Sequence, residues 1–313
     1  MKIVYYDEAD HEEVLALNLQ AFNWPITETT AKRYMQRDER WMDFFGIYAV
    51  ERGHTVGQVL PLKIRTRTSA GVETVGGIAG VTVVPWMARQ GIGTLLMDAA
   101  HRILRENDIR ISFLLTLESL VAYGLYAKLG YFDAASFGAA QKLAKHTRKP
   151  KDIELREYRK KDWRTTDRIY RRSTSRFLGF VRRQSAFLNM KLETTPLTRK
   201  NILLVSSDRD EGYVVITPGE DYTVIREIVC RNASSFNRMV ATVEEGADRK
   251  HILTYLQLPK RTRDWFVRRG YLMDQRTWAR VMVASLDPKL TKKKLEKLYD
   301  FGGVFCMMGL DTF

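Results

Sequence analysis

A strand that leads through two glycines into a helix is the feature that most constrains this chain. Residues 81–97 read VTVVPWMARQGIGTLLM, with Gly91 and Gly93 between the β-branched run and the apolar helix. Glycine lets backbone approach a ligand closely, and the first N–H groups of a helix lack partners within it. That helix end attracts phosphate, although a helix entered through a flexible turn stays an alternative. The glycine spacing fits neither the dinucleotide fingerprint nor the Walker loop.

Length and composition indicate a globular chain of two domains. The 313 residues include 45% hydrophobic and 28% charged residues, enough for two cores of ordinary size. There is no apolar run of about 18 residues, and the N-terminus lacks the apolar core of a signal peptide. We therefore expect a soluble, cytoplasmic protein without a membrane partner. Cys230, Cys306 and the scattered histidines form no disulfide framework and no metal motif.

Positive charge is concentrated in the second half of the sequence. Residues 1–150 carry 18 Lys and Arg against 16 Asp and Glu, whereas residues 151–313 carry 33 against 21. An excess of this size favours an anionic partner near the second half, such as nucleic acid, a phosphate-rich cofactor or an acidic surface. A solvated basic surface explains the same excess equally well.

Two weak echoes in the same order suggest that the chain repeats one fold. An offset of 152 places Leu155 on Ile3, Tyr158 on Tyr6 and Asp162 on Asp10, and LYAKLGYF at 125–132 resembles WFVRRGYL at 265–272. We therefore expect a first domain at 1–147 and a second at 148–313, joined at the basic stretch 145–152. Strands and helices alternate in both halves, which predicts a mixed α/β fold, a mixed sheet flanked by helices.

The coarse element pattern is similar in the two halves. Apolar periodicity and turn residues predict the following elements. In the first half we expect strands at 2–6, 45–51, 56–67, 72–84, 112–116 and 131–142, and helices at 10–22, 29–37, 91–107 and 119–129. In the second half we expect strands at 153–158, 202–206, 212–217, 222–230, 252–257 and 276–285, and helices at 162–176, 232–246, 260–269 and 290–299.

The first half resembles the GNAT N-acetyltransferase superfamily. Val81-Thr82-Val83-Val84-Pro85 and Ala88-Arg89-Gln90-Gly91-Ile92-Gly93 are similar to the family's strand and pyrophosphate loop. Leu125-Tyr126-Ala127-Lys128-Leu129-Gly130-Tyr131 is similar to its Y-x-K-x-G-F/Y segment. The one departure in the loop is Ala88, where the family usually has Arg or Gln. The resemblance implies an acetyltransferase that uses acetyl-CoA, without a metal, to modify a primary amine.

The resemblance also assigns roles to individual residues. Tyr126 would protonate the leaving thiolate, which a phenol can do as a general acid. Glu118 would orient or deprotonate the amine. An ordinary exposed carboxylate at the start of a helix explains this residue equally well. The residues expected to bind the cofactor are Val81, Thr82, Val83, Arg89, Gln90, Gly91, Ile92, Gly93, Thr94 and Ser119.

Within the superfamily, the stretch 57–93 is similar to the enhanced-intracellular-survival (Eis) type acetyltransferases. These have two tandem GNAT domains, of which the second lacks a cofactor loop. Here the second half carries Arg231-Asn232-Ala233 in place of a glycine pair, and Phe266 stands where the first half has Tyr126. The resemblance implies that the terminal carboxylate of Phe313 acts as general base. N-myristoyltransferases share the architecture, so the acyl group stays open.

Two other functions stay open at this point. The stretch from Arg156 to Arg183 interleaves basic residues with Trp163, Tyr170, Phe177 and Phe180, a composition typical of modules that bind single-stranded nucleic acid. An amphipathic helix with a solvated basic face is the favoured alternative. Alternatively, the chain is a catalytically inactive sensor of CoA. The sequence does not specify whether the acceptor is a small molecule or a protein. It also leaves the oligomeric state open, and a homo-oligomer is one of the alternatives.

Overall fold

The computed structural model describes residues 1–144, 153–207, 210–247, 250–254, 260–305 and 310–311. The chain divides into two compact units. Unit 1 contains Met1–Ala134 with Arg280–Leu298, and unit 2 contains Ala135–Ala279 with Tyr299–Thr312. The predicted junction at 145–152 lies outside the described residues. We describe each unit separately.

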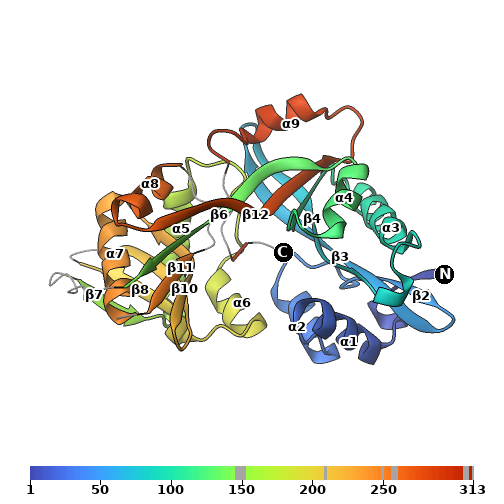
Figure 1. Ribbon diagram of the computed structural model, residues 1–313, viewed down its shortest axis with the longest axis horizontal. Helices are drawn as coiled ribbons and strands as arrows, with labels where there is room; N and C mark the ends of the chain where they lie inside the picture. Colours follow the sequence, from blue (N-terminus) through green and yellow to red (C-terminus); the bar gives the residue numbers. More distant parts are fainter. Residues whose placement is uncertain (145–152, 208–209, 248–249, 255–259, 306–309, 312–313) are drawn as a thin grey trace. The chain divides into compact units, whose positions relative to one another are not determined.

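Unit 1 is built on a mixed sheet in the order β1-β2-β3-β4-β5-β12-β6. Strands β1 to β4 are antiparallel neighbours, whereas β4 and β5 run parallel because α3 crosses between them. Figure 1 shows α1 and α2 on one side of these strands and α3 and α4 on the other. The elements of the first half are β1 Lys2–Tyr5, α1 His11–Phe22, α2 Glu28–Arg37, β2 Ile47–Glu51, β3 His54–Thr68, β4 Gly71–Val83, α3 Ile92–Glu106, β5 Ile111–Thr116, α4 Val121–Lys128 and β6 Phe132–Leu143.

Unit 2 repeats this plan in the order β12-β6-β11-β10-β9-β8-β7. Here the parallel pair is β10 with β11, and α7 is the helix between them. The end of β12, Arg280–Ser285, pairs with β5 and belongs to unit 1. The elements of the second half are β7 Glu154–Glu157, α5 Trp163–Thr174, α6 Phe187–Thr194, β8 Ile202–Ser206, β9 Asp210–Pro218, β10 Tyr222–Cys230, α7 Ala233–Gly246, β11 His251–Thr254, α8 Lys260–Arg268, β12 Leu272–Ser285 and α9 Lys292–Tyr299.

Alternation along the strands of unit 2 separates two cores. On β9, Val214 packs in the cluster that contains Phe236 of α7 and Phe266 of α8. Its neighbours Tyr213 and Val215 pack in the cluster that contains residues of α5 and α6. Since successive strand residues point to opposite faces, α7 with α8 and α5 with α6 cover opposite faces of this sheet.

The mixed α/β fold predicted from the sequence is confirmed, and each predicted helix and strand has a counterpart within a few residues. Helix α6 was missed, because FLNMKLET is short and lacks a capping side chain. Its first residue follows Ala186, whose φ is 57° and whose N–H donates to Asp167. No helix in the described residues is long and apolar enough to cross a membrane.

Candidate functional site

The two parallel strands of unit 1 separate at the point where the glycine turn begins. Strand β4 pairs with β5 over Gly76–Ile78 against Ser112–Leu114, but it continues to Val83. Beyond this point Thr82 and Val83 pair with β3 on the other side, and β5 pairs with β12. The facing edges of β4 and β5 therefore present main-chain groups that an extended ligand can pair with.

A bulge in β4 lies at this separation and is held by buried amides. Thr82 pairs with Gln58 and Ala79 with Leu60, so two residues of β4, one of them Gly80, oppose a single residue of β3. Gly80 adopts a φ of 55°, which favours glycine, and its carbonyl accepts from Gln58 Nε2 at 3.1 Å. Gln58 also exchanges two hydrogen bonds with Asn18 of α1, at 2.8 and 2.9 Å.

Sequence reasoning missed Asn18 and Gln58 as parts of the site. Both side chains are fully buried, and a paired buried amide fixes local backbone because an unpaired one is costly. The signal in the sequence was a glutamine within the otherwise apolar stretch 56–62 of β3.

Helix α3 begins at the glycine turn with an end that no side chain caps. Gly91 is the N-cap residue, with a φ of 84°, and no side-chain hydrogen bond caps the helix. A Cβ built on Gly91 would meet nothing within 4 Å, so conformation and not crowding requires glycine there. Arg89 has a φ of 62°, and the side chains of Arg89, Gln90 and Thr94 are exposed. The end of α3 is thus an open site for an anion.

The second glycine of the turn has a packing role. A Cβ on Gly93 would lie 3.1 Å from the Leu125 side chain, so glycine lets α4 pack close to the start of α3. Ile92 is buried in the core of unit 1. Ile92 is one of the predicted cofactor-binding residues, and it therefore offers a ligand only its main-chain groups. The side chains of Val81, Thr82 and Val83 are half-buried along the separated part of β4.

Tyr126 lies on α4, and 6% of its surface is exposed. Burial raises the pKa of its hydroxyl to about 12, so the phenol stays protonated at neutral pH. No hydrogen-bond partner meets this hydroxyl among the described residues. Its ring packs edge-to-face against Tyr131, with the centroids 5.9 Å apart. A buried donor without an internal partner is free to serve a ligand.

The neighbouring tyrosine is held in a buried polar chain. The hydroxyl of Tyr131 lies 2.8 Å from His101 Nε2 and 2.5 Å from Ser112 Oγ. Burial lowers the pKa of His101 to about 4, so the imidazole is neutral in the folded protein. These hydrogen bonds connect α3 to β5 through Tyr131, which packs against the Tyr126 ring.

Glu118 and Ser119 lie in the exposed turn before α4. Glu118 forms an ion pair with Arg280, whose Nη2 donates to Oε2 at 2.7 Å. Arg280 also lies 3.6 Å from Asp133, which accepts from Tyr123. The Glu118 carboxylate is thus held against the Arg280 guanidinium just before α4.

A pocket of about 650 Å³ borders the loop on the side of α1. Trp86, Met87 and Gln90 of the loop form one wall, and Leu17 and Gln20 of α1 form another. Trp86 is 74% exposed, which is unusual for an indole. The loop is therefore accessible from this side as well.

The corresponding helix end in unit 2 is closed by the chain itself. The Asn232 side chain accepts from the Ser235 N–H at 2.9 Å and caps α7. Ser235 Oγ donates to Glu211, which also pairs with Arg238 at 2.7 Å. A phosphate there would have to displace a side-chain cap and approach a carboxylate. Phe266, the counterpart of Tyr126, is fully buried between Phe236 and Tyr271.

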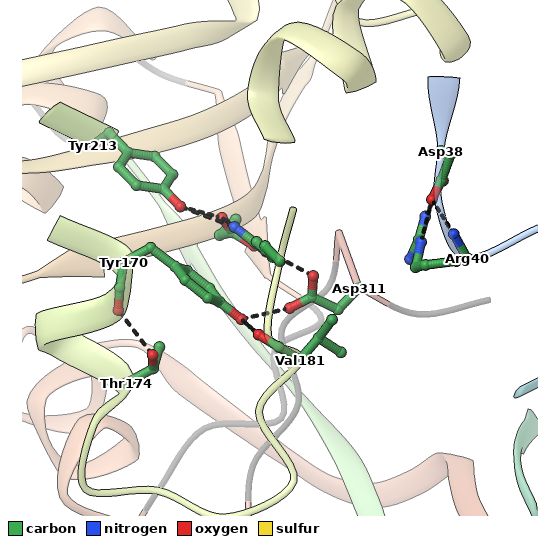
Figure 2. A network of polar contacts seen from close by, with 9 residues as sticks. Asp38, Arg40, Tyr170, Thr174, Val181, Tyr213 and Asp311 are labelled. Carbon is green, nitrogen blue, oxygen red and sulfur yellow. Dashed lines mark hydrogen bonds and ion pairs between the residues drawn. The ribbon is translucent and has the colours of Figure 1, made fainter. Parts of the chain in front are cut away.

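Strand β10 has a bulge between Ile225 and Glu227, and a buried ion cluster forms around Glu227. Arg183 pairs with Glu227 at 2.5 Å and with Asp311 at 2.7 Å, and these side chains are at most 5% exposed. Tyr213 donates to Glu227 at 2.8 Å and Tyr170 to Asp311 at 3.0 Å (Figure 2). The hydrogen bonds with Arg183 and Tyr170 fix Asp311 in unit 2. The predicted base at Phe313 lies outside the described residues.

The first part of the chain is similar to a known domain family. Residues 2–133 match the family model described as an acetyltransferase (GNAT) domain. No curated protein matches the sequence.

Solved structures share the fold over nearly the whole chain. A GCN5-related N-acetyltransferase from Kribbella flavida is 16% identical with a TM-score of 0.66, covering 91% of this chain and 72% of its own. Eis1 from Mycobacterium abscessus is 14% identical with a TM-score of 0.63, covering 92% and 74%. A putative acetyltransferase from Pyrococcus horikoshii is 15% identical with a TM-score of 0.57, covering 97% and 94%. At these identities the likeness is one of fold.

Proposed function

We propose that this chain, whose residues 2–133 match the family model of an acetyltransferase (GNAT) domain, transfers an acetyl group from acetyl-CoA to a primary amine. The observation that carries the proposal is the open end of α3 beside the separated strands β4 and β5. Such an arrangement accepts an extended ligand with a phosphate at one end.

The residues around this opening fit acetyl-CoA. We assign the pantetheine arm to the main chain of Val81–Val83, and the pyrophosphate to the backbone of Gln90–Thr94 with the Arg89 guanidinium beside it. Ser119, in the turn before α4, lines the same site in this proposal. Gly91 supports the assignment, since the space around its Cβ position is empty.

Tyr126 is proposed as the proton donor to the leaving group. Bound acetyl-CoA supplies an acetyl thioester, from which the thiol must depart. The buried phenol keeps its proton at neutral pH, since its pKa is raised to about 12. A hydroxyl without an internal partner can donate to sulfur as negative charge develops there, which stabilises the transition state.

The group that takes the proton from the amine is proposed to be the terminal carboxylate of Phe313. The ion pair of Glu118 with Arg280 favours an orienting role for Glu118 over that of a base. One extra residue after Phe313 would move the carboxylate by about 3.5 Å. Loss of the acidic limb of the kcat/KM pH profile in that extended chain supports the terminal base, and an unchanged profile rules it out.

The test of the proposed function is calorimetry with acetyl-CoA on the Gly91→Asp variant. Asp at 91 puts a negative charge at the open helix end, and we expect acetyl-CoA affinity to fall at least about 100-fold, roughly 2.7 kcal/mol. Gly53→Asp is the matched control, because Gly53 has nearly the same φ, 86°, and equally open surroundings. Equal affinities in the two variants, or no binding by the parent chain at millimolar acetyl-CoA, would refute the proposal.

The inactive CoA sensor is the second candidate. Both functions require acetyl-CoA binding. Only the enzyme turns over acetyl-CoA, so a turnover assay distinguishes the two. Release of free thiol from acetyl-CoA in the presence of a panel of primary amines supports the enzyme. Tight binding without thiol release from any of them supports the sensor.

A further inference from the structure

Helix α5 of unit 2 carries an exposed arginine face that the proposed acetyl transfer does not use. The exposed basic residues of α5 are Arg164, Arg168, Arg171 and Arg172, and the exposed Lys161 and Arg176 lie just before and just after the helix. At 100° per residue the four arginines of α5 lie within an arc of about 100°, on the side of the helix away from the buried Thr166 and Tyr170. We refer to the six basic residues as the α5 basic face.

Helix α5 carries four arginines against one carboxylate. The one carboxylate of the helix, Asp167, is half-buried and accepts from the Ala186 N–H, next to Arg171. Within α5, Arg164 and Arg168, and Arg168 and Arg172, follow at a spacing of four residues, at which like charges destabilise an isolated helix by about 0.2–0.5 kcal/mol per pair.

The aromatic residues interleaved with these charges are turned inward. Tyr170 and Phe180 are buried, and Phe177 packs against the same cluster. Trp163 is partly exposed, with the Arg164 guanidinium 5.1 Å above its ring. The face therefore offers charge without a series of platforms on which bases stack. This corrects the sequence interpretation of interleaved aromatics as part of a single-strand binding surface.

We propose that the α5 basic face is a docking surface for the phosphate backbone of duplex nucleic acid, bound without regard to sequence. The 12-residue helix is about 18 Å long, and one strand carries a phosphate every 3.4 Å along the duplex axis. The guanidinium group binds phosphate through two parallel hydrogen bonds, and every basic residue of α5 itself is an arginine. An acetyltransferase so placed would act on amines near the nucleic acid.

The test is fluorescence anisotropy with a labelled 20-base-pair DNA duplex between 50 and 200 mM salt. The variant Arg164→Gln, Arg171→Gln, Arg172→Gln, Arg176→Gln removes four charges from the face. If each contacts one phosphate, the slope of log K against log salt falls by about 3.6. At 50 mM salt we expect affinity to fall at least about 100-fold. Helix stability should not suffer, since like-charge pairs are removed.

The matched control removes four charges from another exposed helix. Lys292→Gln, Lys293→Gln, Lys294→Gln, Lys297→Gln on α9 changes the net charge equally, and these lysines are exposed. Retained binding in the α9 variant with loss in the α5 variant supports the proposal. Equal loss in both variants would show a net-charge effect and overturn it. Tighter binding of polyglutamate than of DNA by the parent chain would also overturn it, in favour of an acidic protein.

Discussion

The ends of β4 and β10 are equivalent places in the two units, yet one is open and the other is filled. Between β4 and α3 lie residues 84–91, whereas between β10 and α7 lie residues 231 and 232. In unit 1 the bulge is Gly80, held by two buried amides, and helix α3 starts uncapped. In unit 2 the bulge is followed by Glu227, bound to Arg183, and Asn232 caps the helix.

This difference teaches that the fold alone does not make a ligand site. Both units have a parallel strand pair with a helix crossing between them. What separates them is whether the chain's own side chains satisfy the polar groups that the fold exposes. Unit 1 leaves these groups without a side-chain cap at the start of α3, whereas unit 2 pairs them with its own side chains. Three experiments would break or sharpen this contrast.

The largest effect is expected from exchanging the equivalent aromatic residues. Tyr126→Phe removes the proposed proton donor without changing the ring, so kcat should fall by about 10²–10⁴-fold. The acetyl-CoA dissociation constant should change little. A kcat within threefold of the parent value would contradict the assigned role.

The reciprocal change, Phe266→Tyr, is the control for this exchange. It places a hydroxyl in the buried cluster of unit 2, where it would cost about 1–3 kcal/mol of unfolding free energy if unpaired. We expect no gain of activity. Urea denaturation measures the loss.

The next effect is expected from breaking the ion cluster of unit 2. Arg183→Leu leaves Glu227 and Asp311 buried without their cation, and we expect a loss of about 3–5 kcal/mol in unfolding free energy. Arg176→Leu, at an exposed position, should change it by no more than about 0.5 kcal/mol. If denaturant midpoints of the two variants coincide, the cluster does not stabilise unit 2.

The smallest effect concerns the acid sensitivity of the buried hydrogen-bonded residues His101, Tyr131 and Ser112. Burial lowers the pKa of His101 to about 4, below the value of about 6.5 expected in the unfolded chain. The unfolded state therefore binds the extra proton, and stability present above pH 6.5 is lost as pH falls towards 4.

His101→Gln removes this titration and leaves a donor for Tyr131. The loss of unfolding free energy between pH 7 and pH 4.5 should be about 2–3 kcal/mol smaller in the variant than in the parent chain. Parallel curves for the two proteins would place the acid sensitivity elsewhere.

Much of the fold could be predicted from the sequence because the apolar periods are strong and local. The spacing in residues 81–107 predicted both the strand and helix α3 to within a residue or two at each end. Helix α6 could not be predicted, since its eight residues depend on packing of Phe187 and Leu188 in a core. The extent of β12, from Leu272, was also underestimated.

For the candidate site, the sequence by itself determined the glycine turn, the helix that follows it and the tyrosine of α4. These depend on neighbouring residues and on backbone conformations that glycine adopts readily. Only the tertiary structure decided that Asn18 reaches Gln58 across 40 positions, that Glu118 pairs with Arg280, and that Tyr170, Phe177 and Phe180 pack inward. The physical reason is that hydrogen bonds and burial join residues distant in sequence, where no local period records the partner.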